Sequence, residues 1–329
     1  MSYRKSEGTY RSADGRTDIH YYRFLPDGNP TAILQISHGM SEYLERYESE
    51  GFVGALTDAG IIVCGNDHLG HGKSVASEND FGYFEDYRFL AEDLHTLNGI
   101  MRKTYPRLPY LLFGHSMGSF AARIYAVTYE DIDGAVFCGT SAGNQPLGPG
   151  RALAVLIGKV RGGHHRSGLL RAMSFAGYNR RFAREKDELS WLTSLAEVRE
   201  RYRNDPLCGI AFTDTGCREL FAMLAAVSDD SWADAMPLSL PVLLISGEDD
   251  PVGDNGEGVR EVAARLEERE LCSLTLKLYP GSRHEIFNDV CRDEMMRDLI
   301  AWIRETAEGV VAARTLNAVP FGRQGETVL

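Results

Sequence analysis

Six short apolar runs, separated by longer amphipathic segments, constrain the fold of this chain more than any other feature. Runs of this length that are apolar on both faces are typical of buried strands in a parallel sheet. They are AILQIS (32–37), IIVCG (61–65), YLLFG (110–114), GAVFCG (134–139), PVLLISG (241–247) and LTLKLY (274–279). The segments between or after them predict helices over 43–59, 87–104, 117–129, 256–269 and 289–307. This alternation predicts an open, mostly parallel α/β sheet with helices on both faces.

Two segments depart from the alternation. Residues 8–24 (GTYRSADGRTDIHYYRF) alternate polar and apolar side chains around Asp-Gly, which predicts an antiparallel hairpin at the sheet edge. Residues 142–236 contain helical pieces but no convincing strand, so we expect a helical insertion there, a candidate lid over an active site. The expected domains are a first core part (1–141), the lid (142–236), a second core part (237–307) and a C-terminal tail (308–329) without periodicity.

Composition excludes several classes of protein. The 35 basic and 47 acidic residues give a net charge of −12, which repels nucleic acid. Neither a signal peptide nor an apolar run near the roughly 18 residues of a membrane span occurs, so we expect a cytoplasmic protein.

The six cysteines lack CxxC spacing and predict buried, reduced thiols. DHLGH (67–71) lacks a further carboxylate or thiol at ligand spacing, so no metal and no cofactor is expected.

Residues 151–203 reverse the acidic balance of the chain. They contain 12 Lys/Arg and 5 Asp/Glu, a local net charge of +7. One interpretation is a solvated helical surface. The other is a face that contacts anionic lipid or a phosphorylated substrate, which would give the lid a transient contact with a membrane surface.

The pattern Gly-x-Ser-x-Gly occurs twice, around Ser116 and around Ser141. A serine nucleophile must be exposed, stand beside a base and have donors for the oxyanion, and a sharp strand-to-helix turn provides all three. Ser116 follows YLLFG and precedes the helix-forming SFAARIYAVTY. Ser141 is followed by two prolines and three glycines, which cannot begin a helix at once. We therefore predict Ser116 as the nucleophile and Ser141 as the strand exit into the lid.

An acid and a histidine are expected after later strands, in the order Ser, acid, His. Asp249 and Asp250 both follow PVLLISG, and spacing alone does not separate them. His284 is the histidine in the loop after the last strand. The histidines near other strand ends are interpreted as structural groups: His38, His68, His71 and His115.

These residues resemble the α/β-hydrolase superfamily, and within it the serine hydrolases grouped with monoacylglycerol lipases, bacterial lysophospholipases and S33-type serine aminopeptidases. The resemblance is carried by HGMSEYLERY (38–47), NDHLGHGKS (66–74), GHSMGS (114–119), GEDDPVG (247–253) and PGSRHEIFND (280–289), with YRNDPLCG (202–209) in the lid. It implies a triad of Ser116, Asp250 and His284, because Asp250 fills the acid position of the family's G-x-x-D pattern. It also implies an oxyanion hole formed by the backbone N–H groups of Met40 and Met117.

The same resemblance implies the activity. A serine hydrolase of this group cleaves a small-molecule acyl ester through an acyl-enzyme, here a monoacylglycerol, a lysophospholipid or another short to medium acyl ester. An aminopeptidase on the same fold is the alternative enzyme, and a non-catalytic, ligand-binding relative is the alternative outside enzymes. Tyr43 stands where many relatives have a histidine, which affects the expected substrate preference and not the catalytic machinery.

Overall fold

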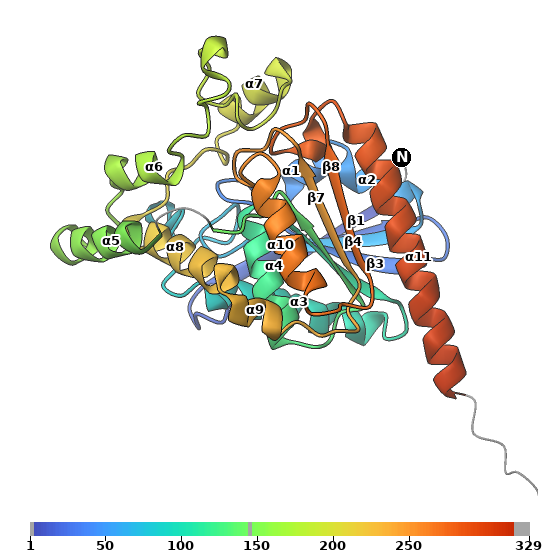
Figure 1. The fold of residues 1–329 in the computed structure, drawn as a ribbon. Helices are drawn as coiled ribbons and strands as arrows, with labels where there is room; N and C mark the ends of the chain where they lie inside the picture. The colour runs from blue at the N-terminus through green and yellow to red at the C-terminus, as the bar shows by residue number, and fades with distance from the viewer. Residues whose placement is uncertain (1–2, 144–146, 319–329) are drawn as a thin grey trace, which may run out of the picture.

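A mostly parallel sheet forms the centre of the molecule (Figure 1). The structure is a computed structural model, and it describes residues 3–143 and 147–318. Within these residues the sheet has eight strands in the order β1-β2-β4-β3-β5-β6-β7-β8. The strands are β1 Tyr3–Arg11, β2 Asp18–Pro26, β3 Ala32–Ser37, β4 Ile61–Asn66, β5 Tyr110–His115, β6 Gly134–Cys138, β7 Val242–Gly247 and β8 Leu274–Tyr279. Only the β1–β2 and β2–β4 pairs in this sheet are antiparallel.

Helices cover both faces of the sheet (Figure 1). One face is covered by α3 (Arg88–Thr104), α4 (Met117–Thr128) and α10 (Glu257–Glu267). The other face is covered by α2 (Phe52–Asp58) and α11 (Arg292–Ala318). The predicted α/β class, with helices on both sides of a mostly parallel sheet, is confirmed and is the α/β-hydrolase arrangement.

The apolar runs form strands β3 to β8, as predicted, and β3 to β7 are buried at every position. β8 lies at the edge of the sheet and is mostly part-exposed or exposed, so the prediction of a buried strand is wrong there. Neighbouring residues of β5 alternate between the two cores. Leu112 packs beneath α3 and α4, whereas Leu111 and Phe113 pack beneath α2 and α11. A strand covered on both sides needs apolar side chains at every position, which explains the continuous runs.

The N-terminal hairpin of β1 and β2 lies at one edge of the sheet, as its Asp-Gly turn predicted. Gly15 has a φ of 71°, in the left-handed region that favours glycine. Asp14 fixes the turn by accepting hydrogen bonds from the amides of Arg16 and Thr17, at 2.7 and 2.8 Å.

Two helices differ from the sequence-based expectation. The single helix predicted over 43–59 is divided into α1 (Glu45–Ser49) and α2, because Gly51 between them is left-handed, with a φ of 80°. α11 continues past the expected end at 307 to Ala318, into the predicted tail. Residues 311–316 in its last turns are exposed and include Ala312, Ala313 and Arg314, which favour a helix without an apolar stripe. Residues 319–329 of the tail lie outside the described residues.

The chain between β6 and β7, which we call the insertion, is helical, and none of its described residues forms a strand. Its helices are α5 (Leu147–Arg161), α6 (Gly168–Ser174), α7 (Ala196–Asn204), α8 (Asp214–Ser228) and α9 (Asp230–Asp234), with a 3₁₀ turn at Ala183–Glu185. Trp232 of α9 donates a hydrogen bond to the Arg123 carbonyl of α4 at 2.9 Å, so the end of the insertion packs on the core. Residues 144–146 lie outside the described residues, and the role of the insertion as a lid stays a prediction.

The cysteines are all free, and five are buried or half-buried. Cys272 is exposed, so the prediction of a buried thiol is wrong there; it lies in the surface loop before β8. Among the helices that the structure describes, none is both long and apolar enough to cross a membrane. The cytoplasmic location remains a prediction from the sequence.

Candidate active site

Ser116 occupies a sharp turn between β5 and α4. Its backbone angles, φ 54° and ψ −124°, are unusual for a residue with a side chain, and such a conformation costs of order 1–3 kcal/mol. Two glycines let the strand and helix pack closely. A Cβ at Gly118 would lie 2.0 Å from the Ser37 carbonyl oxygen, and one at Gly114 would lie 2.4 Å from the Gly118 oxygen. The turn presents Ser116 to a cavity and places the N-terminus of α4 beside it.

The structure brings Asp250, and not Asp249, into contact with His284. Asp250 is buried, and its Oδ2 accepts a hydrogen bond from His284 Nδ1 at 2.9 Å. Its other oxygen accepts a hydrogen bond from the Val252 amide at 2.9 Å. Asp249 is part-exposed and pairs with Arg181 at 2.9 Å. The two aspartates that spacing could not separate therefore have different surroundings.

His284 lies in the loop between β8 and α11 and lines the same cavity as Ser116. Burial alone would lower the pKa of His284, but the charge and hydrogen bond of Asp250 outweigh it and raise that pKa above its usual value. Trp191 of the insertion packs against the ring, with centroids 5.2 Å apart. Gly139, at a φ of 58°, lies so close that a Cβ there would be 3.2 Å from the imidazole. Hydrogen bonding and packing together hold the ring beside the cavity.

Met40 and Met117 also line the cavity beside Ser116. Met117 is the first residue of α4, so its N–H has no acceptor within the helix. Met40 follows Gly39, where a Cβ would lie 3.2 Å from the Ser116 Cβ. Within the described part of the chain neither methionine amide has a hydrogen-bond partner. Both N–H groups are therefore free to bind a substrate oxygen.

The cavity above Ser116 and His284 has a volume of about 410 Å³. Large apolar wall residues come from α4, from α8 and from the chain between α6 and α8: Phe120, Phe175, Trp191, Phe212, Phe221 and Leu224. Glu188 and Asn179 of the insertion also line it. A mostly apolar cavity with a few polar groups suits a ligand that joins an acyl chain to a polar head.

A buried ion network behind the cavity was not predicted from the sequence. Arg46 of α1 donates to Glu42 at 2.9 Å and to both carboxylate oxygens of Glu285, the residue after His284. Burial opposes the charge on Arg46, yet the two carboxylates hold the pKa of its guanidinium well above the usual value. The spacing of Glu42 and Arg46 suggests a helical ion pair, but Glu285 is 239 residues further along the chain, and no local pattern connects it to them.

Glu42 extends this network to the backbone of Gly39, the residue before Met40. Its Oε1 accepts a hydrogen bond from the Gly39 amide at 2.5 Å and from the Tyr47 hydroxyl at 2.9 Å. His115 Nδ1 lies 3.1 Å from the same oxygen. Burial would raise the pKa of Glu42, but His115 and Arg46 outweigh it and lower that pKa. Glu42 is therefore a buried carboxylate that orders the backbone next to Ser116.

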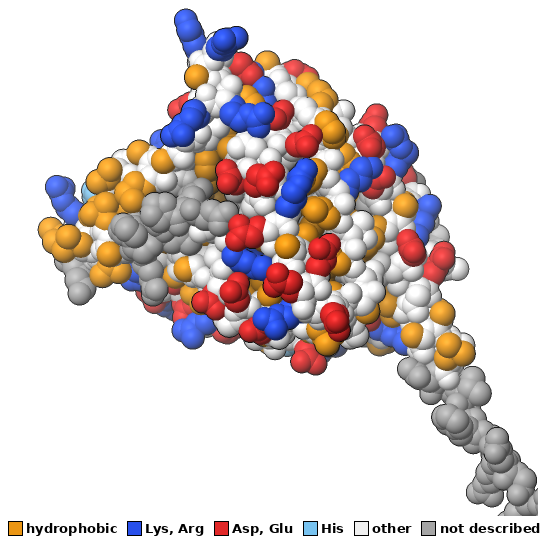
Figure 2. Space-filling model, in the orientation of Figure 1, with side chains coloured by type: hydrophobic (Ala, Val, Ile, Leu, Met, Phe, Trp, Pro, Cys, Tyr) orange, Lys and Arg blue, Asp and Glu red, His pale blue; other side chains and the backbone are white. Residues whose placement is uncertain are grey.

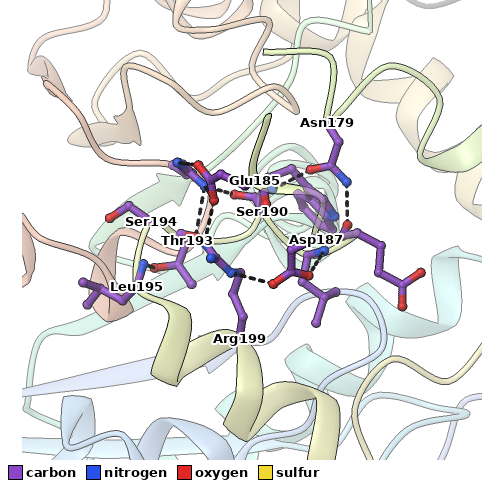
Figure 3. A network of polar contacts seen from close by, with 12 residues as sticks. Asn179, Glu185, Asp187, Ser190, Thr193, Ser194, Leu195 and Arg199 are labelled. Atoms are coloured by element: carbon purple, nitrogen blue, oxygen red, sulfur yellow. Dashed lines mark hydrogen bonds and ion pairs between the residues drawn. The ribbon is translucent and has the colours of Figure 1, made fainter. Parts of the chain in front are cut away.

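The insertion has its own polar network around Asp187 and Thr193 (Figure 3). Arg199 of α7 donates to Asp187 Oδ2 at 2.9 Å and to the Thr193 carbonyl at 2.8 Å. Asn179 donates to the Glu188 carbonyl at 2.6 Å. These contacts hold the segment that carries Trp191 in a fixed loop.

That loop is bound to the segment that carries His284. Thr193 Oγ1 donates to the Asn288 carbonyl at 2.9 Å, and the Ser194 amide donates to Asp289 at 3.2 Å. Thr193 and Asp289 are buried. The position of His284 is therefore coupled to the position of this part of the insertion.

A second set of hydrogen bonds joins the insertion to the loop after Met40. Tyr43 donates to Asp205 at 2.8 Å, and Ser41 donates to the Ile210 carbonyl at 2.7 Å. Tyr202 of α7 donates to the Ser41 carbonyl at 3.1 Å. Tyr43 does not line the cavity. In this chain, the residue that replaces the usual histidine contacts the insertion.

Ser141 lies after β6 in a stretch that is not helical, and its carbonyl accepts a hydrogen bond from Arg123 at 2.8 Å. It lines the cavity but lacks the strand-to-helix turn that surrounds Ser116. The histidines near other strand ends are buried: His38, His68, His71 and His115. Across residues 3–143 and 147–318, no group of three or more His, Cys, Asp or Glu side chains is arranged to hold a metal ion.

Comparison with known proteins gives consistent matches. The model of the Hydrolase_4 family, described as serine aminopeptidase, S33, matches residues 28–290. A monoacylglycerol lipase of Mycolicibacterium smegmatis is 27% identical over 309 residues, which cover 92% of this chain and 98% of that protein. A monoglyceride lipase of Mus musculus is 26% identical over 300 residues, covering 89% and 88%. The crystal structure of a thermostable carboxyl esterase from Bacillus coagulans in complex with glycerol superimposes with a TM-score of 0.86 at 30% identity, covering 93% and 99%.

Proposed function

Because this chain belongs to the Hydrolase_4 (serine aminopeptidase, S33) family, we propose that it is a serine hydrolase that cleaves carboxylic esters of the monoacylglycerol type. The observation that carries the proposal is the buried Asp250–His284 hydrogen bond beside the Ser116 turn, at one apolar cavity. The lipase and esterase names of the similar proteins support the same reaction class.

In the proposed mechanism, Ser116 Oγ attacks the ester carbonyl and His284 takes its proton. Asp250 holds the imidazole through Nδ1 and stabilises the imidazolium that forms. The amides of Met40 and Met117 donate to the oxyanion. His284 then protonates the leaving alcohol, and water attacks the acyl-enzyme with His284 as the base, which releases the acid and restores Ser116.

A covalent probe and two serine variants test the nucleophile. A fluorophosphonate should label the wild type and not Ser116→Ala, and this variant should lose roughly 10⁴-fold or more in kcat with the fold intact. Ser141→Ala is the matched control, since it lines the same cavity, and it should keep both labelling and activity. Activity that survives in Ser116→Ala but is lost in Ser141→Ala would make the assignment wrong, and a wild type that is neither labelled nor active would favour the non-catalytic alternative.

A substrate panel tests the class of ester. Monoacylglycerols and a chain-length series of nitrophenyl esters should be hydrolysed, because the cavity wall beside Ser116 is largely apolar. Lysophospholipid belongs in the same panel as the alternative ester. Aminoacyl nitroanilides test the aminopeptidase alternative. Uniform inactivity on the esters, with activity on the nitroanilides, would overturn the proposal.

The proposal includes transient contact with a membrane surface through α5 and α6. Figure 2 shows hydrophobic side chains gathered at the α5 end of the molecule, and Leu156, Val160 and Leu169 are 60%, 75% and 56% exposed. The exposed Arg161 and Arg171 lie on the same two helices. Other basic residues of the segment 151–203 form ion pairs with acidic residues. Arg199 and Arg203 pair with Asp187, and Arg201 pairs with Glu50. These features favour a contact that is mainly apolar, with a smaller electrostatic part.

Vesicle sedimentation tests this contact. Binding to phosphatidylcholine vesicles should increase when phosphatidylglycerol is included, and high salt should remove that increase but leave the apolar part. Leu156→Ser/Val160→Ser should weaken binding at all salt concentrations. Leu316→Ser is the control, because Leu316 is 74% exposed on α11. Equal binding by the double variant and the control would contradict the assigned surface.

A further inference from the structure

The oxyanion donor at Met40 depends on the orientation of one peptide unit, the one between Gly39 and Met40. The described residues contain no cis peptide bond, so the C=O and N–H of this unit point in opposite directions. A contact that fixes the Gly39 carbonyl therefore also fixes the direction of the Met40 N–H. Gly39 has no side chain to restrict its backbone, so the restraint must come from neighbouring residues.

His38 provides a hydrogen bond to that carbonyl. Its Nδ1 lies 2.8 Å from the Gly39 carbonyl oxygen, and its Nε2 accepts a hydrogen bond from the His68 amide at 2.8 Å. A backbone amide only donates, so Nε2 carries no proton and Nδ1–H is the donor. The ring is fully buried, and burial lowers the pKa of His38 although Glu42 and Asp67 oppose this. The imidazole is therefore neutral, with its one proton on the nitrogen that faces Gly39.

We propose that His38 is a positioning residue for ester hydrolysis, whose Nδ1–H holds the Gly39–Met40 peptide so that the Met40 N–H faces the oxyanion formed at Ser116. This inference rests on the proposed function. His38 does not line the cavity and acts through the backbone. The preceding peptide unit is held as well, by Glu42, which accepts the Gly39 N–H at 2.5 Å. A donor fixed in advance stabilises the oxyanion without reorganisation during the reaction.

Two substitutions separate the Nδ1 donor from the Nε2 acceptor. In His38→Asn, the side-chain amide nitrogen takes the place of Nδ1 and can donate to Gly39. In His38→Gln, the amide oxygen takes the place of Nε2 and can accept from His68, but the donor to Gly39 is lost. Complete loss of one oxyanion donor lowers kcat by about 10²–10³-fold. On a nitrophenyl ester we expect His38→Gln to lower kcat by about 30-fold or more with KM unchanged, and His38→Asn to stay within about tenfold of the wild type.

His71→Asn is the matched control for disturbance of the buried histidines. The His71 ring lies 5.2 Å from that of His38, but its hydrogen bond among the described residues goes to the Leu69 carbonyl and not to Gly39. Its kcat should stay within about twofold of the wild type. Thermal unfolding of all three variants separates loss of stability from loss of kcat. Equal kcat losses in His38→Asn and His38→Gln, or full kcat in His38→Gln, would overturn the inference.

The outcome for the proposed function is read separately, from fluorophosphonate labelling of the wild type and its loss in Ser116→Ala. A labelled, active wild type with an unaffected His38→Gln variant overturns only the role of His38.

If His38→Gln fails to fold, NMR of the wild type with ¹⁵N-labelled histidine still tests the role of His38, because it reports which nitrogen of each ring carries the proton. We expect His38 to carry its proton on Nδ1 at neutral pH. A proton on Nε2 would overturn the inference, since a bare Nδ1 cannot donate to Gly39.

Discussion

Asp249 and Asp250 are adjacent in the sequence but differ in burial and in partner. Asp250 is buried and bonded to His284, whereas Asp249 is part-exposed and bonded to Arg181. A surface ion pair contributes about 0–1 kcal/mol and has no effect on the tautomer of His284. The two positions therefore form a matched pair for mutagenesis.

Asp250→Asn should lower kcat by about 10⁴-fold, because the substituted amide no longer holds His284 in the tautomer that accepts the serine proton. Asp249→Asn should leave kcat within about threefold of the wild type. Steady-state kinetics on one nitrophenyl ester measures both variants. The assignment of the acid is wrong if Asp249→Asn is the variant that loses activity.

The pH dependence of the reaction follows from His284. Asp250 raises the pKa of His284 in the folded protein above its value in the unfolded chain. The protonated ring therefore stabilises the fold fully at pH values below the unfolded pKa of His284. This stabilisation is lost as the pH rises through the folded pKa of His284. The proposed base is the neutral ring, so we expect activity to increase over the same pH range. We expect the acid limb of kcat/KM to have its midpoint above the ordinary histidine value of about 6.5. A midpoint below that value, measured on the free enzyme, would contradict the direction of the shift.

At the level of elements, the short helix α1 is connected to the His284 loop by a buried ion network. Arg46 lies between Glu42 and Glu285, and all three side chains are at most 4% exposed. Removing one partner from a buried ion pair is costly, because the remaining charge keeps its desolvation penalty. Here removal of the arginine leaves two buried carboxylates.

Arg46→Ala should therefore lower the free energy of unfolding by about 3–5 kcal/mol. Arg201→Ala is the control, since the Arg201 side chain is 53% exposed where it pairs with Glu50, and this solvent-screened pair should contribute about 0–1 kcal/mol. Urea denaturation monitored by circular dichroism gives both values. Similar values for the two variants would mean that the network adds no stability beyond that of an exposed pair.

The sequence predicted the strands better than it predicted the ends of helices. β3 to β7 are covered on both faces, so each of them is a continuous apolar run that is visible without a structure. The division at Gly51 depends on one left-handed residue within an otherwise helical pattern. Residues 311–316 of α11 are exposed, so burial requires no apolar stripe there. The break at Gly51 depends on the backbone conformation of one residue, and the end of α11 lies on an exposed surface. The spacing of apolar residues in the sequence reports neither.

At the scale of the whole molecule, the sequence pointed to Ser116 and His284 through strand order, but not to the contacts that hold them. The Arg46–Glu285 pair and the Thr193–Asn288 hydrogen bond join residues 239 and 95 positions apart. Such contacts arise because the carboxyl ends of parallel strands meet at one edge of the sheet, where the loops pack on each other. Local patterns carry no information about which loop residues meet, so these positioning contacts required the structure.

The same long-range contacts predict that the insertion moves unevenly. Residues 185–210 are bonded to the loops that carry His284 and Met40, whereas α5 and α6 have no hydrogen bond to either loop among the described residues. We expect amide hydrogen exchange to be faster over 147–174 than over 185–210, because segments with fewer buried contacts open more easily. Opening of the cavity would then involve mainly α5 and α6.

Asp289→Ala tests the coupling directly, because Asp289 accepts hydrogen bonds from the amides of Ser194 and Arg283. It should increase exchange over 190–195 and also lower kcat, since it loosens the insertion and the His284 loop together. Glu197→Ala, at an exposed position of α7, should change neither. Faster exchange in Asp289→Ala with an unchanged kcat would show that His284 keeps its place without the insertion. Uniform exchange over 147–210 in the wild type would mean that the whole insertion opens as one unit.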